Sequence, residues 1–197
     1  MRPYHPSDSD PGKPAPEPNV PARLPLARFV KEFIDTVTPA FVIALLINLF
    51  LAQGTYVHGQ SMEPNLHTAQ RLILEKVSYR LHTPERGDIV VVRVEGFAHP
   101  LIKRVIGLPG ETVEIHDNRV FIDGEPLNEP YLDDVRQANY GPTYVEPLHV
   151  FVMGDNRSAS NDSRYFGAVH LETIVGRAWL SYWPLEEVRL VQSGRDG

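Results

Sequence analysis

The chain has 197 residues, of which 42% are hydrophobic and 22% charged, and its formal net charge is −6. The absence of cysteine excludes disulfides and thiolate metal sites. The acidic balance and the scattered cations argue against a nucleic-acid-binding surface, so no nucleic acid is expected as a partner. The length suits one folded domain in addition to a tail and a membrane segment.

The first part of the chain combines a proline-rich stretch with an uncharged apolar stretch. The proline-rich stretch predicts a disordered tail over residues 1–28. Residues 36–57 contain no charged residue, and Asn48 is the only polar residue between Phe41 and Ala52. A helix of this length can cross a bilayer core of ~30 Å. We therefore expect residues 29–56 to form a single transmembrane anchor helix.

Two other structures for the apolar stretch are less consistent with the sequence. A cleaved signal peptide has a shorter apolar region nearer to the start of the chain. A buried core helix would have a polar face at helical spacing, and this stretch has none. Arg23, Arg28 and Lys31 precede the stretch, and the next cation is Arg71. This bias predicts a cytoplasmic N-terminus and a main domain on the other side of the plasma (inner) membrane.

After the apolar stretch, short runs of strand-forming residues alternate with turn residues. The runs occupy residues 71–75, 88–93, 101–106, 112–115, 120–122, 150–153 and 175–183. Residues 116–119 and 123–124 are typical of tight hairpin turns. The pattern predicts a mostly β fold over residues 57–190, followed by a short tail over 191–197.

Ser61 and Lys103 are the side chains most suited to chemistry. A serine hydroxyl becomes a good nucleophile only when a base takes its proton, and lysine is such a base only when its amine is neutral. Burial can lower the pKa of a lysine by several units. In a strand over 101–106, Lys103 would share a face with Leu101 and Val105, while Arg104 would point to solvent or to a partner.

Simpler interpretations exist for these two residues. An isolated serine in a glycine-rich segment is usually a turn residue, and a lysine between apolar residues is usually a strand residue with its amine in water. A Ser-His-Asp site with His58, His67 or His99 as base is a further alternative. His58 is too close to Ser61 along the chain, and the others lack a supporting motif. No metal-binding motif is present, so neither a metal nor a cofactor is expected.

Four segments in order strengthen the catalytic interpretation. They are Gly59-Gln60-Ser61-Met62-Glu63-Pro64-Asn65-Leu66, Arg86-Gly87-Asp88-Ile89-Val90-Val91, Lys103-Arg104-Val105-Ile106-Gly107-Leu108-Pro109-Gly110-Glu111 and Gly154-Asp155-Asn156-Arg157-Ser158-Ala159-Ser160-Asn161-Asp162-Ser163-Arg164. Together they resemble the conserved boxes of bacterial type I signal peptidase, a membrane-anchored serine protease. The resemblance covers roughly residues 54–184 and implies a β-rich catalytic domain with a small β subdomain over 107–148.

The resemblance also implies roles for individual residues. Ser61 matches the nucleophile of the family and Lys103 the general base. Ser160 matches a serine that orients the lysine amine, and Met62 matches a methionine beside the substrate cleft. Gly59 stands where some members carry a serine that helps to bind the oxyanion.

Three further residues match structural supports of the family. Asp162 and Arg164 match a paired acid and base that hold the last loop, and Asp155 matches part of the same support. Asn65 stands where threonine is common, which affects the expected turn geometry rather than the chemistry.

The expected function is the cleavage of N-terminal signal peptides from secretory preproteins at the membrane, with preproteins and membrane lipids as partners. The sequence gives no indication of the oligomeric state. Three competing functions remain open: a self-cleaving repressor, a peptidase for pilus-like substrates and a non-enzymatic binder of exported chains. The repressor should carry a helix-turn-helix, whereas the binder would use Ser61 and Lys103 only incidentally.

Overall fold

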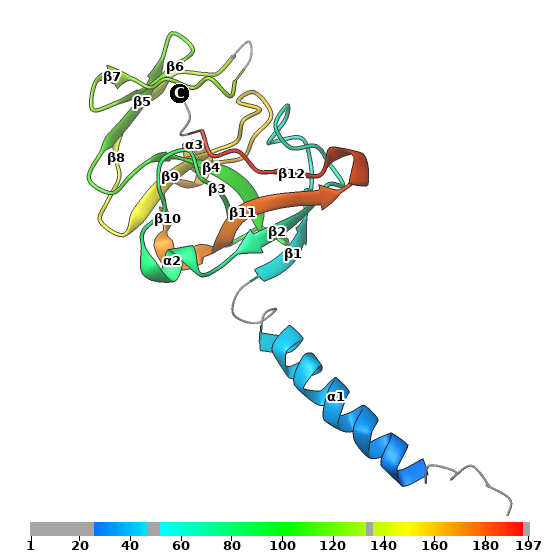
Figure 1. Cartoon of the computed structure of the whole chain (residues 1–197). Helices are drawn as coiled ribbons and strands as arrows, with labels where there is room; N and C mark the ends of the chain where they lie inside the picture. The colour runs from blue at the N-terminus through cyan, green and yellow to red at the C-terminus, as the bar shows by residue number, and fades with distance from the viewer. Residues whose placement is uncertain (1–25, 47–51, 133–135, 195–197) are drawn as a thin grey trace, which may run out of the picture. The chain divides into compact units, whose positions relative to one another are not determined.

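The computed structural model describes residues 26–46, 52–132 and 136–194 (Figure 1). The chain divides into two compact units, residues 1–42 and 43–197, and each is described by itself. The predicted tail over 1–28 lies almost entirely outside the described residues.

The N-terminal unit contains most of one helix, α1 (Leu26–Leu46), with Pro39 in its interior. In the described part of the chain, no helix has the length and apolar character required for a membrane span. The predicted anchor helix over 29–56 is wrong at its C-terminal end, because Ala52–Tyr56 forms strand β1. Gly54 and β-branched Thr55 are poor helix formers, and pairing with a neighbouring strand outweighs the apolar pattern. Residues 47–51 of the predicted helix lie outside the described residues.

The second unit is mostly β, as predicted, and its larger sheet has eight strands. The order is β1-β2-β11-β3-β4-β9-β10, with β12 paired to β11. The bounds of its strands are Ala52–Tyr56 (β1), Arg71–Glu75 (β2), Ile89–Val92 (β3), Leu101–Gly107 (β4), His149–Met153 (β9), Val169–His170 (β10), Ile174–Trp183 (β11) and Arg189–Leu190 (β12). All the pairs are antiparallel.

A four-stranded sheet, in the order β7-β6-β5-β8, fills most of the predicted subdomain region. Its strands are Thr112–His116 (β5), Arg119–Ile122 (β6), Glu125–Pro126 (β7) and Tyr140–Tyr144 (β8). The hairpin predicted over 116–119 forms around Asp117 and Asn118, with φ of 50° and 62°. These two residue types tolerate the positive φ that tight hairpins require.

Short helices and the core complete this unit. The helices are α2 (Ser78–Leu81), α3 (Ser163–Phe166), η2 (Leu171–Thr173) and η3 (Leu185–Glu187). One buried cluster packs Val57, Met62 and Leu66 against the apolar residues of β2 and β3. The loop that carries Ser61 is therefore anchored in the core on both sides of the serine.

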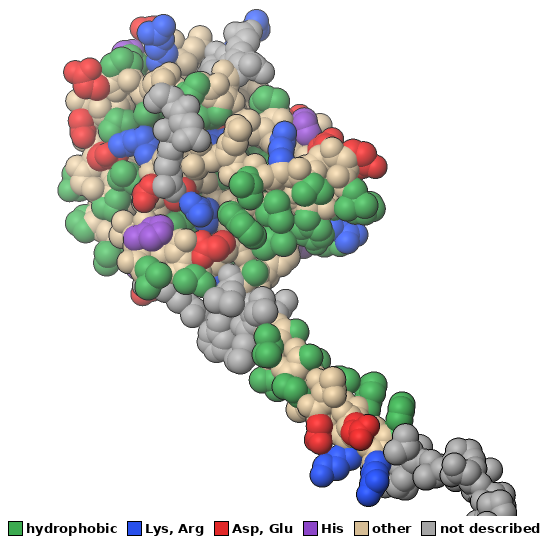
Figure 2. All heavy atoms as spheres, in the orientation of Figure 1, with side chains coloured by type: hydrophobic (Ala, Val, Ile, Leu, Met, Phe, Trp, Pro, Cys, Tyr) green, Lys and Arg blue, Asp and Glu red, His purple; other side chains and the backbone are tan. Residues whose placement is uncertain are grey.

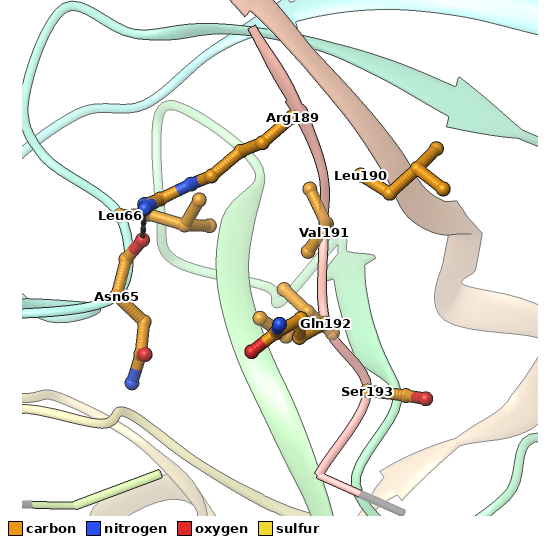
Figure 3. Close-up of a pocket in the computed structure, with 8 residues that line it drawn as sticks. Asn65, Leu66, Arg189, Leu190, Val191, Gln192 and Ser193 are labelled. Carbon is orange, nitrogen blue, oxygen red and sulfur yellow. Dashed lines mark hydrogen bonds between the residues drawn. The ribbon is translucent and has the colours of Figure 1, made fainter. Parts of the chain in front are cut away.

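The C-terminal segment is ordered farther than the predicted tail over 191–197 implies. Val191 packs against the core, and Gly194 N–H donates to the Gly87 carbonyl at 3.2 Å. This segment lines a pocket of about 580 Å³, opposite Asn65 and Leu66 (Figure 3). Ser61 and Lys103 are not among the residues that line this pocket.

Candidate active site

Ser61 is held in place by backbone hydrogen bonds on two sides. Before it, Val57 continues the pairing of β1, because its N–H donates to Gln70 and its carbonyl accepts from Ala69. The carbonyl oxygen of Ser61 itself accepts from the N–H of Asn156 at 3.0 Å. The serine is thus connected both to the edge of the large sheet and to the polar loop that follows β9.

Lys103 reaches Ser61 from the middle of the large sheet. It lies in β4, between β3 and β9, and pairs with Val90 in register. Only 2% of Lys103 is exposed. Its Nζ lies 2.7 Å from Ser61 Oγ, which is hydrogen-bonding distance. In the described part of the chain, no histidine is hydrogen-bonded to Ser61, so the geometry favours the lysine over the Ser-His-Asp alternative.

Burial changes the protonation of this amine. Loss of solvation lowers the pKa of Lys103 to about 8, although the carboxylates of Asp162 and Asp155 act in the opposite direction. The positive charge of Arg164 adds to the lowering. A lysine with an ordinary pKa of ~10.4 is almost entirely protonated at neutral pH, whereas about a tenth of this amine is neutral at pH 7. The amine can therefore accept a proton from the serine.

An ion pair lies beside the amine. Arg164 donates to both carboxylate oxygens of Asp162 at 2.8 Å, and Asp162 also accepts the N–H of Gly154 at 3.0 Å. Burial would raise the pKa of Asp162, but the hydrogen bonds and the charge of Arg164 hold it below the usual range. Asp162 is therefore a fixed negative charge that partly offsets the effect of burial on Lys103.

Arg104 follows Lys103 in β4 and is buried as well. Its guanidinium donates to both oxygens of Asp155 at 2.8 and 2.7 Å, and to the carbonyl of Gly87 at 2.9 Å. The side chains of Arg104 and Asp155 are 1% and 0% exposed. The sequence predicted that Arg104 points either to solvent or to a partner. The prediction of solvent is wrong, and the partner is Asp155. This bidentate pair joins the strand of Lys103 to the start of the polar loop.

A family model described as signal peptidase, peptidase S26, matches residues 30–183 of this chain. A probable signal peptidase I-2 of Synechocystis sp. is 41% identical over 81% of this chain and 76% of its own length. The chain belongs to the signal peptidase family. The signal peptidase I of Leptolyngbya laminosa is 38% identical over 92% of this chain and 95% of that protein. A crystal structure of a signal peptidase I from Enterococcus faecalis matches with a TM-score of 0.45 and 33% identity, over 49% of this chain and 97% of that chain.

Membership of the signal peptidase family confirms the resemblance and makes the protein a serine-type endopeptidase of the signal peptidase I class. The structure brings most of the predicted site residues together around Ser61 and Lys103. Ser160 is 7% exposed, and its hydroxyl acts on the carboxylate of Asp162, whose pKa it helps to lower. Among the described residues, the amine of Lys103 is hydrogen-bonded to Ser61 and not to Ser160, so the predicted contact between Ser160 and the amine is not formed.

Two predicted residues have surroundings that differ from expectation. Met62 is 1% exposed and packs in the core, so it has almost no surface that a substrate could contact. Its visible contribution is to hold the Ser61 loop. Gly59 has a φ of 75°, and a Cβ built on it would meet no atom within 4 Å. The space beside Gly59 is therefore open.

Sequence reasoning missed the part played by Asn65. Its Nδ2 donates to Asp155 Oδ2 and to the carbonyl of Tyr131, both at 2.9 Å. The ring of Tyr131 lies under the guanidinium of Arg104, 3.9 Å from Cζ to the ring centroid. Asn65 thus ties the Ser61 loop to the buried ion pair. The only signal of this role in the sequence was that asparagine stands at position 65, where threonine is common in the family.

Proposed function

We propose that the protein is a membrane-anchored endopeptidase that removes signal peptides from exported preproteins, with Ser61 as nucleophile and Lys103 as general base. The observation that carries this proposal is the 2.7 Å contact between Lys103 Nζ and Ser61 Oγ, in a site where burial lowers the pKa of the lysine to about 8. Family membership supports the reaction class, and the contact supports these particular residues.

The reaction follows from this contact. Neutral Lys103 takes the proton of Ser61 Oγ as the oxygen attacks the carbonyl carbon that precedes the scissile bond. The resulting ammonium gives its proton to the departing amine, which leaves an ester on Ser61. Lys103, neutral again, then takes a proton from a water molecule that attacks the ester carbonyl. As the bond to Ser61 Oγ breaks and the signal peptide is released, the ammonium returns this proton to Ser61 Oγ, which restores the hydroxyl and the neutral amine.

The developing oxyanion needs hydrogen-bond donors near Ser61. The backbone N–H of Ser61 has no hydrogen bond among the described residues, so it is available as one donor. Gly59 has no side chain that could act as a second hydrogen-bond donor to the oxyanion, so the second donor must also be a backbone N–H. Backbone donors fixed before the reaction are effective stabilisers of such charges.

The substrate has a free sheet edge to bind. Among the described strands, β1 pairs only with β2, so its other edge is open just before Ser61. An extended peptide can add to such an edge through backbone hydrogen bonds. Alternate residues of the peptide would then face the buried side, where small residues at −1 and −3 fit the A-x-A pattern of secretory signals.

Membrane attachment is supported by the sequence and by one surface. The part of the uncharged stretch that precedes strand β1, residues 36–51, is apolar apart from a few small or amide residues, and the cations before it favour a cytoplasmic N-terminus. Figure 2 shows hydrophobic side chains gathered over β11 and β12. In η3, β12 and the residue between them, Leu185, Val188 and Leu190 are 68%, 50% and 61% exposed. Apolar patches of this kind often contact membranes or other proteins.

Cleavage of a defined preprotein tests the function. The full-length protein in liposomes is expected to cut a preprotein once, after the alanine at −1, and mass spectrometry identifies the new N-terminus. Replacing that alanine by leucine should abolish the cut, because a small side chain is required at this position. A binder of exported chains would give no product, and cutting at unrelated sites would contradict the proposed specificity.

Membrane attachment has its own test. Membranes that carry the full-length chain are washed with carbonate at pH 11, which removes peripheral proteins. The chain is expected to stay in the membrane pellet, and protease added from outside should reach the β domain in spheroplasts. Release into the wash, or a protected β domain, would contradict the predicted anchor or its orientation.

Gly154→Ala is expected to damage the site directly. A Cβ at position 154 would overlap the side chain of Ser160 and the carbonyl oxygen of Ser61. Displacing Ser61 by about 1 Å should lower the cleavage rate by about a hundred-fold. Gly141→Ala is the matched control, because a Cβ there meets nothing within 4 Å. Equal activity of the two variants would show that the crowding around Gly154 is unimportant.

A further inference from the structure

Two histidines lie against each other beside the catalytic residues, and the proposed reaction uses neither of them. The rings of His58 and His99 stack with centroids 5.3 Å apart and an interplanar angle of 15°. His58 lies three residues before Ser61, and His99 lies four residues before Lys103. At ~3.3 Å per residue, the Cα atoms of His58 and His99 lie within about 13 Å of the Cα atoms of Ser61 and Lys103, respectively. The stack therefore joins the two segments that deliver the nucleophile and the base.

The nitrogens of these two rings are available for a ligand. Neither ring has a hydrogen bond or ion pair within the described ranges, and both residues are exposed. The other described histidines each contact a polar atom; they are His67, His82, His116, His149 and His170. Among the described histidines, His58 and His99 beside the active site are thus the two whose rings have no polar partner.

The free edge of β1 determines which part of a substrate meets this pair. Along this edge Tyr56 and His58 face outward, whereas Val57 is 2% exposed and faces the core. In a peptide added to the edge, side chains alternate between the same two faces. If the small residues at −1 and −3 face inward with Val57, the residue at −2 faces outward beside His58.

A fixed positive charge lies on the same outward face. The guanidinium of Arg71 lies over the ring of Tyr56, 5.1 Å from Cζ to the centroid, and the ring centroids of Tyr56 and His58 are 6.4 Å apart. An imidazole offers an N–H donor when neutral and two when charged. A carboxylate at this place would gain hydrogen bonds from the histidines and attraction from Arg71.

We infer that His58 and His99 recognise an acidic side chain at position −2 of the substrate, between the two small residues of the cleavage site. The inference rests on the proposed function and adds a specificity that the family assignment does not contain. A charge-assisted hydrogen bond at an exposed site is worth about 1 kcal/mol, which corresponds to about a five-fold preference.

Two preproteins that differ only at −2, glutamate against glutamine, test the inference with the full-length protein in liposomes. The ratio of their kcat/KM values isolates the contribution of the carboxylate, because the protonation of Lys103 affects both substrates equally. We expect a ratio of about five at −2 and a ratio of one when the same pair is placed at −5. A ratio of one at −2 with both substrates cleaved would overturn the inference. Cleavage of neither substrate would instead contradict the proposed function.

Variants of the pair show whether the histidines cause the preference. His58→Phe and His99→Phe keep a planar ring for stacking but remove the ring nitrogens. Each is expected to bring the ratio at −2 close to one while the glutamine substrate is still cleaved. His149→Phe, on β9, is the control and should keep the wild-type ratio. A preference that persists in both site variants would overturn the assignment to His58 and His99.

Discussion

Replacing Lys103 by methionine is expected to lower kcat/KM for a preprotein by about 10⁴-fold or more. Methionine fills a similar volume in the buried strand, but it has no basic nitrogen for the proton of Ser61. Ser61→Ala should cause a loss of similar size, because each variant removes one half of the same proton transfer. Combining the two should therefore cost no more than either alone. The measurement is single-turnover cleavage of a preprotein by the full-length variants in liposomes.

The variant Lys103→Arg distinguishes a role of Lys103 as general base from a role as a positive charge. A guanidinium stays protonated at every pH of interest, so this variant should be as inactive as the methionine variant. Lys76→Met and Ser158→Ala are controls for a lysine and a serine outside the contact, and both should retain wild-type rates. Substantial cleavage by Lys103→Met or by Ser61→Ala would remove this pair of residues from the mechanism.

Asp155→Asn is expected to lower the free energy of unfolding by about 3 kcal/mol. The substitution keeps the shape of the side chain but leaves the buried guanidinium of Arg104 without its counter-charge. Urea unfolding of the full-length protein in detergent measures the change. Because Asp155 raises the pKa of Lys103, its loss should also move the pH dependence of cleavage to lower pH.

Asp117→Asn is the matched control for this prediction, since the side chain of Asp117 is 93% exposed. Its free energy of unfolding should change by less than about 0.5 kcal/mol. Replacing Arg104 and Asp155 together by methionine and leucine should recover part of the stability, because no unpaired charge remains. If Asp155→Asn were as stable as the control, the buried pair would not hold the polar loop to β4.

Local patterns in the sequence were sufficient to predict most of the β domain. Turn residues such as Asp117 and Asn118 restrict the backbone where they stand, so the hairpin over 116–119 was predictable. The strand around Lys103 followed from apolar residues between turn signals. The contact of Lys103 with Ser61 is long-range, and its prediction came from the resemblance to the signal peptidase family.

Contacts that depend on the packing of distant segments could not be predicted in the same way. The pairing of Arg104 with Asp155 joins residues 51 positions apart, and nothing local distinguishes it from an arginine facing solvent. The burial of Met62 has the same origin, because strands β2 and β3 supply the core around it. The end of the apolar stretch was also misjudged, because its last residues pair with β2 as strand β1.

The dependence of cleavage on pH tests the central claim most directly. A general base acts in its neutral form, so kcat/KM for a preprotein should rise with pH as Lys103 loses its proton. With burial lowering the pKa of Lys103 to about 8, the rate should increase about ten-fold per pH unit below this value and level off above it. A rate that continues to rise to pH 10 would indicate a lysine with an ordinary pKa. A plateau that already begins at pH 6 would indicate a different base, and either result would contradict the account.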